Sequence, residues 1–397
     1  MAKLVVHQDR IEDVEKLLGL CPFGALEESD GRVVIGDGCK MCRLCVKSGA
    51  VEYIEGETEE IDKSQWQGIC VLAEQADSEL HPVTLELLGK AEELAGKTNQ
   101  PVYCLLMGEK VSGPAQELLH YGADRVYVYE APALRCFSIE PCTAVLEDFI
   151  RRVHPSSILV GATPVGRQLA PRTAARFRTG LTADCTVLDI LPNTDLVQIR
   201  PAFGGNIMAE ICTPNHRPQM ATVRYKVMDA PPRREAADGE IVRCSVGEDR
   251  LGSRAEVVEV HKKEKVSSIE HAGVLVAAGR GIRTREDLAM VEALADVLGG
   301  ELAATRPMVE AGWVEPRRQI GLSGRTVRPK LIITCGVSGA VQFTAGMNHS
   351  ETIFAINKDP DAPIFKVADY GAVGDIYEII PALTEKIKAE GGVCHAV

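Results

Sequence analysis

The sequence predicts an α/β protein with two parallel-sheet domains, preceded by a small α+β module that carries a cysteine cluster. Three observations predict this architecture. Between residues 69 and 177, short β-branched runs alternate with amphipathic segments, and the alternation returns from residue 274. Strands separated by helices pair in parallel through right-handed crossovers. Four of the 13 cysteines lie between residues 21 and 45, where this alternation is absent.

The chain is long enough for several domains. Its 397 residues, 45% of them hydrophobic, can bury a core in each of two or three domains. Residues 54–65 are acidic and polar, and residues 228–256 contain Pro231-Pro232 and lack sustained periodicity, so both segments are typical of boundaries. We therefore expect a first module over residues 1–60, an α/β domain over 66–227, a linker over 228–256 and a nucleotide-binding domain over 257–397.

Composition argues against two classes of function. The 56 acidic and 44 basic side chains leave a formal charge of -12, which disfavours a nucleic-acid-binding surface and suits docking onto other proteins. No apolar run approaches the roughly 20 residues of a membrane span. Residues 1–10 lack the hydrophobic core and cleavage site of a signal peptide. We expect a cytoplasmic protein with no membrane span and no nucleic-acid partner.

The cysteines of the first module have the spacing of an iron–sulfur site. Cys39, Cys42 and Cys45 form a C-x2-C-x2-C run, and Cys21 belongs to a distant Cys-Pro pair. A two-cluster bacterial ferredoxin has two such motifs, and the fourth cysteine of each motif ligates the cluster of the other motif. The cysteines of this chain correspond to half of that pattern. A structural zinc site is the alternative, but zinc usually takes two pairs of ligands. The spacing therefore favours one 4Fe-4S cluster.

A second cluster is not expected. The positions that it would need carry Ile11, Val14, Leu17 and Gly49, and the three apolar side chains are suited to refilling a vacated cavity. Basic side chains at Lys40, Arg43 and Lys47 either offset the cluster's negative charge or are simply solvated. The remaining cysteines are expected to be small core residues: Cys70, Cys104, Cys136, Cys142, Cys185, Cys212, Cys244, Cys335 and Cys394.

The second domain is predicted from alternating patterns. Strands are expected at 69–73, 102–107, 126–129 and 157–161, and helices at 82–95, 113–120, 141–153 and 165–177. The glycines of the loop from Gly161 to Arg167 are interpreted as packing residues and not as a phosphate site. Three further strands, with a turn at Gly204-Gly205, are expected to extend the sheet as antiparallel strands: 196–203, 208–212 and 220–225.

The last domain is expected to bind a nucleotide. A strand at 274–278 leads through Gly279-Arg280-Gly281 into a helix from Thr284, which makes an anion site. A second strand, 331–334, breaks into the glycine-containing loop 335–339. The next strand, 352–357, ends in polar residues. Open α/β sheets bind ligands at the carboxyl ends of their strands.

These residues also resemble a known family. The sequences SGAVQ (338–342), AIN (355–357) and DPDAPIFKVADYG (359–371), with Gly346 and Asp375, are similar to the FAD-binding domain of the electron-transfer flavoprotein alpha subunit. The similarity extends through TRPMVEAG (305–312) and QIGLSG (319–324), and more loosely over residues 66–397, but does not cover the first sixty residues. The cofactor-binding residues that it indicates are Arg280, Arg306, Gln319, Gly321, Ser323, Gly324, Ser338, Gly339, Gln342, Asn357 and Asp375.

The resemblance implies particular roles in an FAD site. Arg306 would be the cation beside the flavin and Ser323 the partner of its N5 atom, while Asn357 and Asp375 would reach the adenosine half. Each residue can also be explained by local structure alone: Ser323 as part of a turn, Asn357 as a strand cap and Asp375 as a helix N-cap. Many members of the family have a histidine where this chain has Phe343. A hydrogen bond near the flavin O2 is therefore expected to be missing.

The resemblance also implies an electron carrier and not a stand-alone enzyme. It implies a heterodimer with a beta subunit that holds the bifurcating flavin, while this chain carries a shuttling FAD. With its ferredoxin-like module the chain resembles flavin-based electron-bifurcating systems of anaerobes, in which NADH, ferredoxin and a lactate-type or acyl-CoA dehydrogenase exchange electrons. The alternatives are a redox-sensing nucleotide-binding protein and a self-sufficient NAD-dependent oxidoreductase. The latter is disfavoured because the sequence lacks a convincing acidic ribose ligand and acid/base set.

Overall fold

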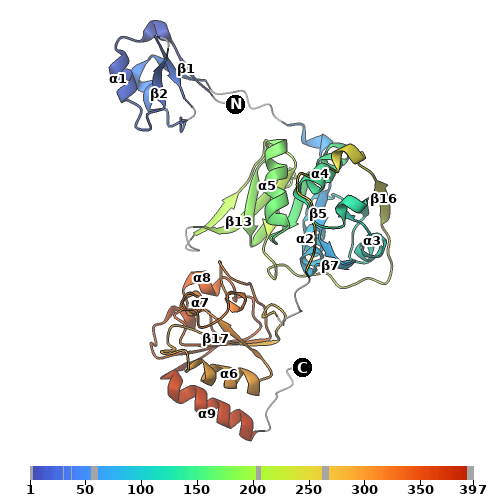
Figure 1. Cartoon of the computed structure of the whole chain (residues 1–397), viewed down its shortest axis with the longest axis vertical. Helices are drawn as coiled ribbons and strands as arrows, with labels where there is room; N and C mark the ends of the chain where they lie inside the picture. Colours follow the sequence, from blue (N-terminus) through green and yellow to red (C-terminus); the bar gives the residue numbers. More distant parts are fainter. Residues whose placement is uncertain are drawn as a thin grey trace. The chain divides into compact units, whose positions relative to one another are not determined.

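The computed structural model describes residues 3–29, 31–36, 38–54, 61–202, 207–261 and 268–390. It divides into two compact units, Met1–Ile61 (unit 1) and Asp62–Val397 (unit 2) (Figure 1). Three features expected from the sequence lie outside the described residues: Cys394, the end of a strand at Phe203 and the turn at Gly204-Gly205. Among the described residues, no helix combines the length and hydropathy that a membrane span requires.

Unit 1 is a small α+β module, as predicted. Two antiparallel strand pairs, β1 with β4 and β2 with β3, enclose a short helix whose N-cap Asp13 accepts a hydrogen bond from the Lys16 backbone N–H. Its elements are β1 (Lys3–Val6), η1 (Gln8–Arg10), α1 (Val14–Gly19), β2 (Leu26–Ser29), β3 (Arg32–Ile35), η2 (Leu44–Ser48) and β4 (Val51–Ile54).

The apolar residues at the missing second-cluster positions belong to the core of unit 1. Leu17 is buried beside Leu26 and Val33, and Ile11 and Val14 pack against this core. The expected apolar packing of these three side chains is therefore confirmed, while the number of clusters stays a prediction. Close apolar packing at this site stabilises the module.

Unit 2 begins with an all-parallel seven-stranded sheet in the order β11-β15-β10-β5-β8-β9-β16. Every residue of β5 is buried. Alternate β5 side chains pack under helices α2 and α3 on one face and under α4 and α5 on the other. The elements are η3 (Lys63–Gln65), β5 (Ile69–Ala73), β6 (Gln75–Ala76), β7 (Glu79–Leu80), α2 (Pro82–Thr98), β8 (Val102–Gly108), α3 (Ser112–Leu119), β9 (Arg125–Glu130), η4 (Pro132–Leu134), α4 (Ile139–Val153), β10 (Ser157–Gly161), α5 (Gly166–Phe177), β11 (Leu181–Cys185), β15 (Gln219–Val223) and β16 (Glu240–Cys244).

The glycines after β10 are packing residues, as predicted. A Cβ added at Gly166, the first residue of α5, would lie 2.0 Å from the carbonyl oxygen of Gly161. Only glycine allows the helix to start this close to the strand end. The α/β fold class and the helices and strands expected between residues 69 and 177 are confirmed, with boundaries that differ by a few residues.

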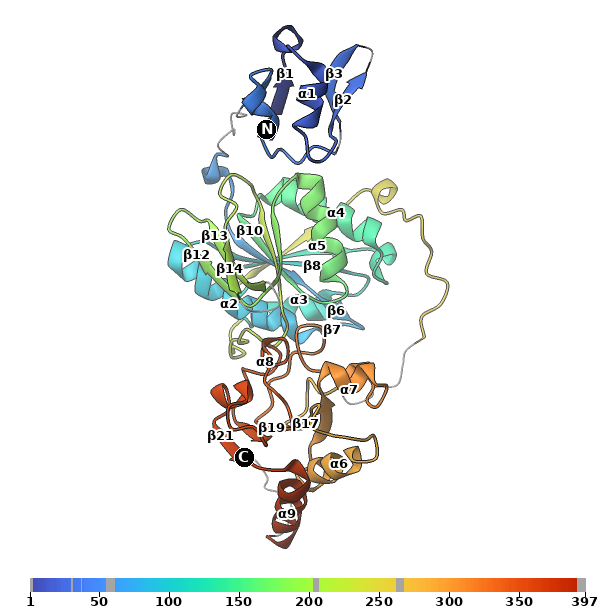
Figure 2. The same cartoon turned by 90° about the vertical axis from the view of Figure 1, so that its left-hand side faces the viewer.

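Two predictions for this domain are wrong. The strands near residues 196–212 do not extend the main sheet: β13 (Leu196–Ala202) and β14 (Ile207–Ile211) form a separate antiparallel sheet with β12 (Val187–Ile190) (Figure 2). The strand expected at 220–225 is parallel, because β15 is buried along its whole length between β10 and β11. Strands covered on both faces are typical of parallel sheets.

The segment interpreted as a linker contains a strand of the main sheet. β16 pairs in parallel with β9 at the edge of the seven-stranded sheet. Its hydrophobic pattern is weak because the strand is short: Ile241 packs against one core, and Val242 and Cys244 pack against the other. The expected linker over residues 228–256 is therefore partly incorporated in the preceding domain.

A five-stranded parallel sheet, in the order β18-β17-β19-β20-β21, forms the rest of unit 2. Helices α6 and α9 cover one face (Figure 2), and loop residues including Ile320 and Val327 cover the other. Helix α6 begins at Leu288, one turn later than predicted, because Thr284 and Asp287 hydrogen-bond each other in a preceding turn. The elements, after η6 (Glu248–Arg250), are β17 (Val274–Ala278), α6 (Leu288–Val297), β18 (Glu301–Ala304), α7 (Arg306–Glu310), η7 (Pro316–Arg318), β19 (Leu331–Cys335), α8 (Val341–Thr344), β20 (Ile353–Asn357), η8 (Pro363–Lys366), β21 (Tyr370–Val373) and α9 (Ile376–Ala389).

Candidate functional site

A cavity of about 800 Å³ lies at the carboxyl ends of strands β17, β18, β19 and β20. The strand order reverses between β17 and β19, and doubly wound sheets bind ligands at such a reversal. The volume is that of a cofactor pocket. Seven of the eleven predicted cofactor-binding residues line the cavity: Arg280, Arg306, Ser323, Ser338, Gln342, Asn357 and Asp375.

Two glycine-containing loops form the floor of the cavity. The Gly281 N–H donates to the Gly336 carbonyl oxygen at 3.0 Å, and a Cβ added at Gly281 would lie 2.7 Å from Gly336 Cα. Gly339 does not line the cavity but supports it, because its φ is +85° and an added Cβ would lie 2.1 Å from the backbone nitrogen of Ile364. Side chains at these positions would separate the loops.

The loop that carries Ser323 is held from behind. Gln319 is buried, and its Nε2 donates a hydrogen bond of 2.9 Å to the Ser323 Oγ. The hydroxyl proton of Ser323 is therefore free to be donated elsewhere, because the oxygen already accepts. The Leu322 N–H donates to the Gln342 carbonyl oxygen at 2.7 Å, which ties this loop to α8.

Three of the predicted cofactor-binding residues support or shape the Ser323 loop and do not line the cavity. Gln319 positions Ser323, and Gly321 and Gly324 shape the turn between them. The Gly321 N–H donates to the Arg325 carbonyl oxygen at 3.1 Å, and the Gly324 N–H donates to the Gly321 carbonyl oxygen at 3.0 Å. The motif QIGLSG (319–324) therefore contains both Ser323 and the residues that position it.

Arg306 is the first residue of α7 and extends into solvent at the cavity edge. Its side chain is 65% exposed, and Nε lies 2.8 Å from Oε1 of Glu310, one helical turn later. Exposed pairs of this kind contribute little stability. The guanidinium can therefore exchange this contact for a ligand, and its remaining N–H groups are available in any case.

Asn357 and Asp375 have structural contacts and also line the cavity. Asn357 Nδ2 donates to the Val337 carbonyl oxygen at 2.7 Å, and its Oδ1 accepts from the Asp359 N–H. Asp375 is the N-cap of α9, since its Oδ1 accepts from the Tyr377 N–H at 2.9 Å. The predicted local roles, a strand cap for Asn357 and a helix N-cap for Asp375, are confirmed. Each residue retains a polar atom for a ligand.

Several lining residues were not predicted. Arg283 lies over the Tyr377 ring, with 4.8 Å from its Cζ to the ring centroid, and its Nη2 is 3.6 Å from Asp375 Oδ2. The Tyr377 hydroxyl donates to Asp287 Oδ2 at 2.7 Å, which connects the start of α9 to the turn before α6. The only sequence signal for these residues is that they adjoin Arg280 and Asp375. Other unpredicted lining residues are Thr305, Lys358, Asp359 and Pro363.

Two residues beside the cavity have no polar role there. Phe343 lines the cavity and is buried against the apolar core, so it supplies no hydrogen bond at the position noted above. Cys335 ends β19 but packs into the core under α6 and α9. Burial raises the pKa of its thiol to about 12, so the thiolate is not accessible near neutral pH.

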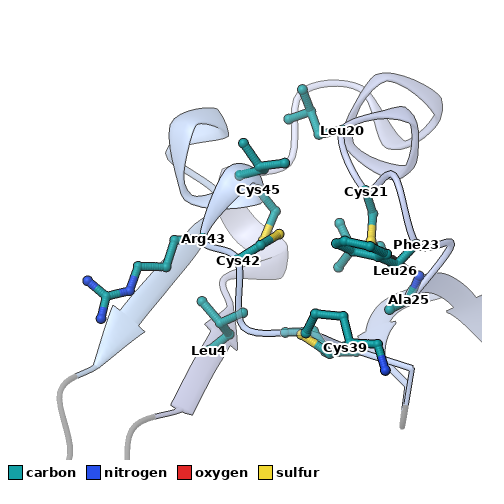
Figure 3. A pocket seen from close by; sticks show the side chains of 13 residues that line it. Leu4, Leu20, Cys21, Phe23, Ala25, Leu26, Cys39, Cys42, Arg43 and Cys45 are labelled. Carbon is teal, nitrogen blue, oxygen red and sulfur yellow. Dashed lines mark hydrogen bonds between the residues drawn. The ribbon is translucent and has the colours of Figure 1, made fainter. Parts of the chain in front are cut away.

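The four cysteines of unit 1 line a second pocket, together with Leu4, Leu20, Phe23 and Leu26 (Figure 3). They come from the turn after α1, from the loop after β3 and from η2. The backbone N–H of Ala25 donates to Cys21 Sγ at 3.2 Å, and the N–H of Met41 donates to Cys39 Sγ at 3.4 Å. Such N–H donors are suited to holding thiolates.

The acidities of two cysteines differ because their surroundings differ. Backbone hydrogen bonds, first from Ala25, lower the pKa of the Cys21 thiol. Burial raises the pKa of the Cys45 thiol, and the neighbouring cysteines raise it further by charge repulsion. No three His, Cys, Asp or Glu side chains within the described ranges converge closely enough to hold one metal ion. The four thiols surround a space and do not meet at one point.

Comparisons with known proteins agree with this architecture. Residues 69–249 match the model of the electron transfer flavoprotein domain, and residues 268–348 match that of the electron transfer flavoprotein FAD-binding domain. Lactate dehydrogenase (NAD(+),ferredoxin) subunit LctC of Acetobacterium woodii is 54% identical over 98% of this chain and 94% of its own length.

Two further relatives are electron transfer flavoprotein alpha subunits. The protein of Thermoanaerobacterium thermosaccharolyticum is 45% identical over 82% of this chain and 99% of its own length. That of Megasphaera elsdenii is 45% identical over 84% of this chain and 100% of its own length. These two thus match less of this chain than the Acetobacterium subunit does, although they match along almost their whole lengths. With this identity over nearly the whole length of its relatives, the chain belongs to the family of electron-transfer flavoprotein alpha subunits.

Proposed function

We propose that this chain is an electron-carrying subunit that holds one FAD in the cavity of its C-terminal domain and one 4Fe-4S cluster between Cys21, Cys39, Cys42 and Cys45. The observation that carries the proposal is the presence of both sites in one chain: a cofactor-sized cavity in a domain of the FAD-binding family and a four-cysteine pocket in a separate unit. In this proposal residues 1–60, residues 66–227 together with β16, and residues 257–397 work as the three functional domains.

The residues of the cavity fit an FAD. The loops that carry Gly281 and Gly336 allow close approach of the pyrophosphate, and Arg280 and Ser338 on these loops line the cavity and suit its charge. Asn357 and Asp375 suit the adenosine half, and Ser323 can donate its free proton to the ring. When bound, the flavin accepts and releases one or two electrons. Arg306 would stabilise the negative charge that reduction adds, because arginine stays charged at every working pH.

The cysteine pocket fits an iron–sulfur cluster better than a structural zinc ion. Ligands of one ion must all reach a single atom, whereas each cysteine of a cubane binds a different iron. The C-x2-C-x2-C spacing with a distant Cys-Pro, and the four cysteines lining one pocket, support the cubane. Backbone N–H groups on Cys21 and Cys39 would hold the thiolates and adjust the cluster potential.

The proposed partners follow from the relatives. A beta subunit would complete the heterodimer of the family and hold the bifurcating flavin. The lactate dehydrogenase (NAD(+),ferredoxin) relative from Acetobacterium favours a lactate-type dehydrogenase over an acyl-CoA dehydrogenase, with NAD and ferredoxin as the other electron carriers. The chain would then connect these partners in a flavin-based bifurcating or confurcating complex. Its 13 cysteines favour a reducing compartment such as the cytoplasm.

The proposal is tested by removing the first module. A protein that begins at Gln65 is expected to fold and to keep its FAD, because unit 2 contains complete cores against both of its parallel sheets. In complex with the beta subunit and dehydrogenase it should lose electron exchange with ferredoxin. Flavin content and ferredoxin-dependent turnover are the two measurements. Soluble protein without flavin, or full ferredoxin-dependent turnover, would contradict the proposal.

A further inference from the structure

The rim of the cysteine pocket, which comprises residues 40–44 with Leu20, Phe23 and Lys47, is an exposed surface that combines apolar and basic side chains. The residues from Lys40 to Leu44 are all exposed, and this loop contains the exposed Cys42. Four large apolar side chains with exposures between 37% and 53% lie on this loop or beside the pocket: Leu20, Phe23, Met41 and Leu44. Scattered apolar residues on a surface are ordinary, but a group around a potential redox centre is typical of a contact surface.

The same rim is positively charged, although the chain as a whole carries a charge of -12. Lys40, Arg43 and Lys47 are exposed, and the segment from Gly38 to Ala50 contains no acidic residue. None of the three forms an ion pair with a described carboxylate. Asp37 directly precedes this segment, and the other acidic residues up to residue 54 lie elsewhere in the sequence: Asp9, Glu12, Asp13, Glu15, Glu27, Glu28, Asp30 and Glu52.

The loop is held in a defined shape. Met41 and Arg43, on either side of Cys42, have φ values of +52° and +63°. Residues other than glycine adopt this conformation at a cost, and such positions occur preferentially at functional sites. Arg43 is fixed over the Tyr53 ring, with 3.6 Å from Cζ to the ring centroid. The rim therefore presents its charges from an ordered surface.

We propose that this rim is the docking surface for a small acidic electron-carrier protein with a surface-exposed redox centre. The inference rests on the proposed function, because it requires the cluster to be present. Lys40, Arg43 and Lys47 would attract the acidic partner, and the apolar residues would pack in the contact. One electron is exchanged: one protein is oxidised as the other is reduced, and no bond forms or breaks.

An alternative role for the basic residues is to offset the charge of the cluster alone. Lys40 and Arg43 line the cysteine pocket, but Lys47 does not. If the basic residues served only to offset the charge of the cluster, the exposed apolar side chains beside them would have no role. Charge complementarity speeds encounter by about 10-fold to 1,000-fold and loses its effect as ionic strength rises. The two roles therefore differ in their dependence on salt.

The test compares two double charge reversals in the complete complex. Lys40→Glu with Lys47→Glu reverses charge on the rim, and Arg10→Glu with Lys16→Glu makes the same change on η1 and α1. The probe is an acidic bacterial two-cluster ferredoxin, and stopped-flow absorbance gives the second-order rate of electron exchange at low and high salt. We expect the rim variant to be at least about 10-fold slower at low salt, with the difference shrinking at high salt. The control should stay within about twofold.

The outcomes separate the docking proposal from the proposed function. Equal rates for the rim variant and the control, with full iron content in both, would overturn the docking proposal alone. Dissociation of the dehydrogenase or beta subunit from the rim variant would also overturn it, since the rim would then be an internal interface. Absence of iron from the unaltered chain would overturn the cluster assignment. If the double variant lost iron, Lys47→Glu alone, outside the pocket lining, would decide by the same salt-dependent rate.

Discussion

Replacing Cys42 by serine is expected to remove the iron–sulfur absorbance of the protein while its FAD stays bound. Cys42 lines the cysteine pocket of unit 1, and a serine hydroxyl is a poor substitute for a thiolate ligand. The flavin cavity belongs to unit 2, so its residues are unaffected. Iron content should fall from about four per chain, the number in one cubane, towards zero. Metal analysis and the visible spectrum measure both parts of this prediction.

A matched control is available in the same chain. Cys212, wrongly predicted to be a core residue, is also an exposed cysteine but lies in unit 2, beyond the end of β14. Cys212→Ser should therefore keep both the iron and the flavin. Cys21→Ser should behave like Cys42→Ser, because Cys21 lies on the opposite side of the pocket and accepts the Ala25 hydrogen bond. Iron that remained at about four per chain in either variant would exclude that cysteine as a ligand.

Replacing Arg306 by alanine is expected to lower the reduction potential of the bound FAD by tens of millivolts. Reduction adds negative charge to the flavin, and a fixed cation at the cavity edge stabilises the reduced form more than the oxidised form. A loss of about 1.4 kcal/mol of this differential stabilisation corresponds to about 30 mV for two electrons. Charge contacts of this kind contribute about that much or more. A redox titration with bound FAD gives the value.

Three variants define what the Arg306 result means. Ser323→Ala should change the potential less, because a neutral hydrogen bond is weaker than a charge contact. Arg285→Ala removes an exposed arginine that does not line the cavity and should leave the potential unchanged. Glu310→Gln removes the carboxylate that pairs with Arg306 and should raise the potential. An unchanged potential in Arg306→Ala, with FAD still bound, would place Arg306 outside the flavin environment.

Much of the fold could be predicted from local patterns. The β5 segment is apolar at every position because it is covered on both faces, and such a run predicts a strand in a parallel sheet. β16 could not be predicted in this way, since an edge strand with charged residues at positions 240 and 243 carries little hydrophobic signal. β13 and β14 were predicted as antiparallel strands and pair with each other, but the sheet to which they belong was predicted wrongly, because no local pattern shows which sheet a strand pair joins.

The candidate site was predicted in part for a similar reason. The motif residues Arg306, Ser323 and Asn357 lie in separate segments, and the structure places them on one cavity. Gln319 was predicted as a cofactor-binding residue, which stays a prediction; its buried side chain donates a hydrogen bond to Ser323, a contact that the motif alone does not show. Tyr377 was missed because its contribution depends on contact with Asp287, which is 90 residues away. Such contacts exist only after folding.

The central claim is that this one chain holds both an FAD and an iron–sulfur cluster. Native mass spectrometry of the anaerobically purified chain, combined with metal analysis, tests it most directly. The predicted result is the mass of the 42.9 kDa chain plus one FAD and one 4Fe-4S cluster, with only the FAD remaining on the protein that begins at Gln65. A chain that carries a single zinc ion on its cysteines, or that binds no flavin, would contradict the account.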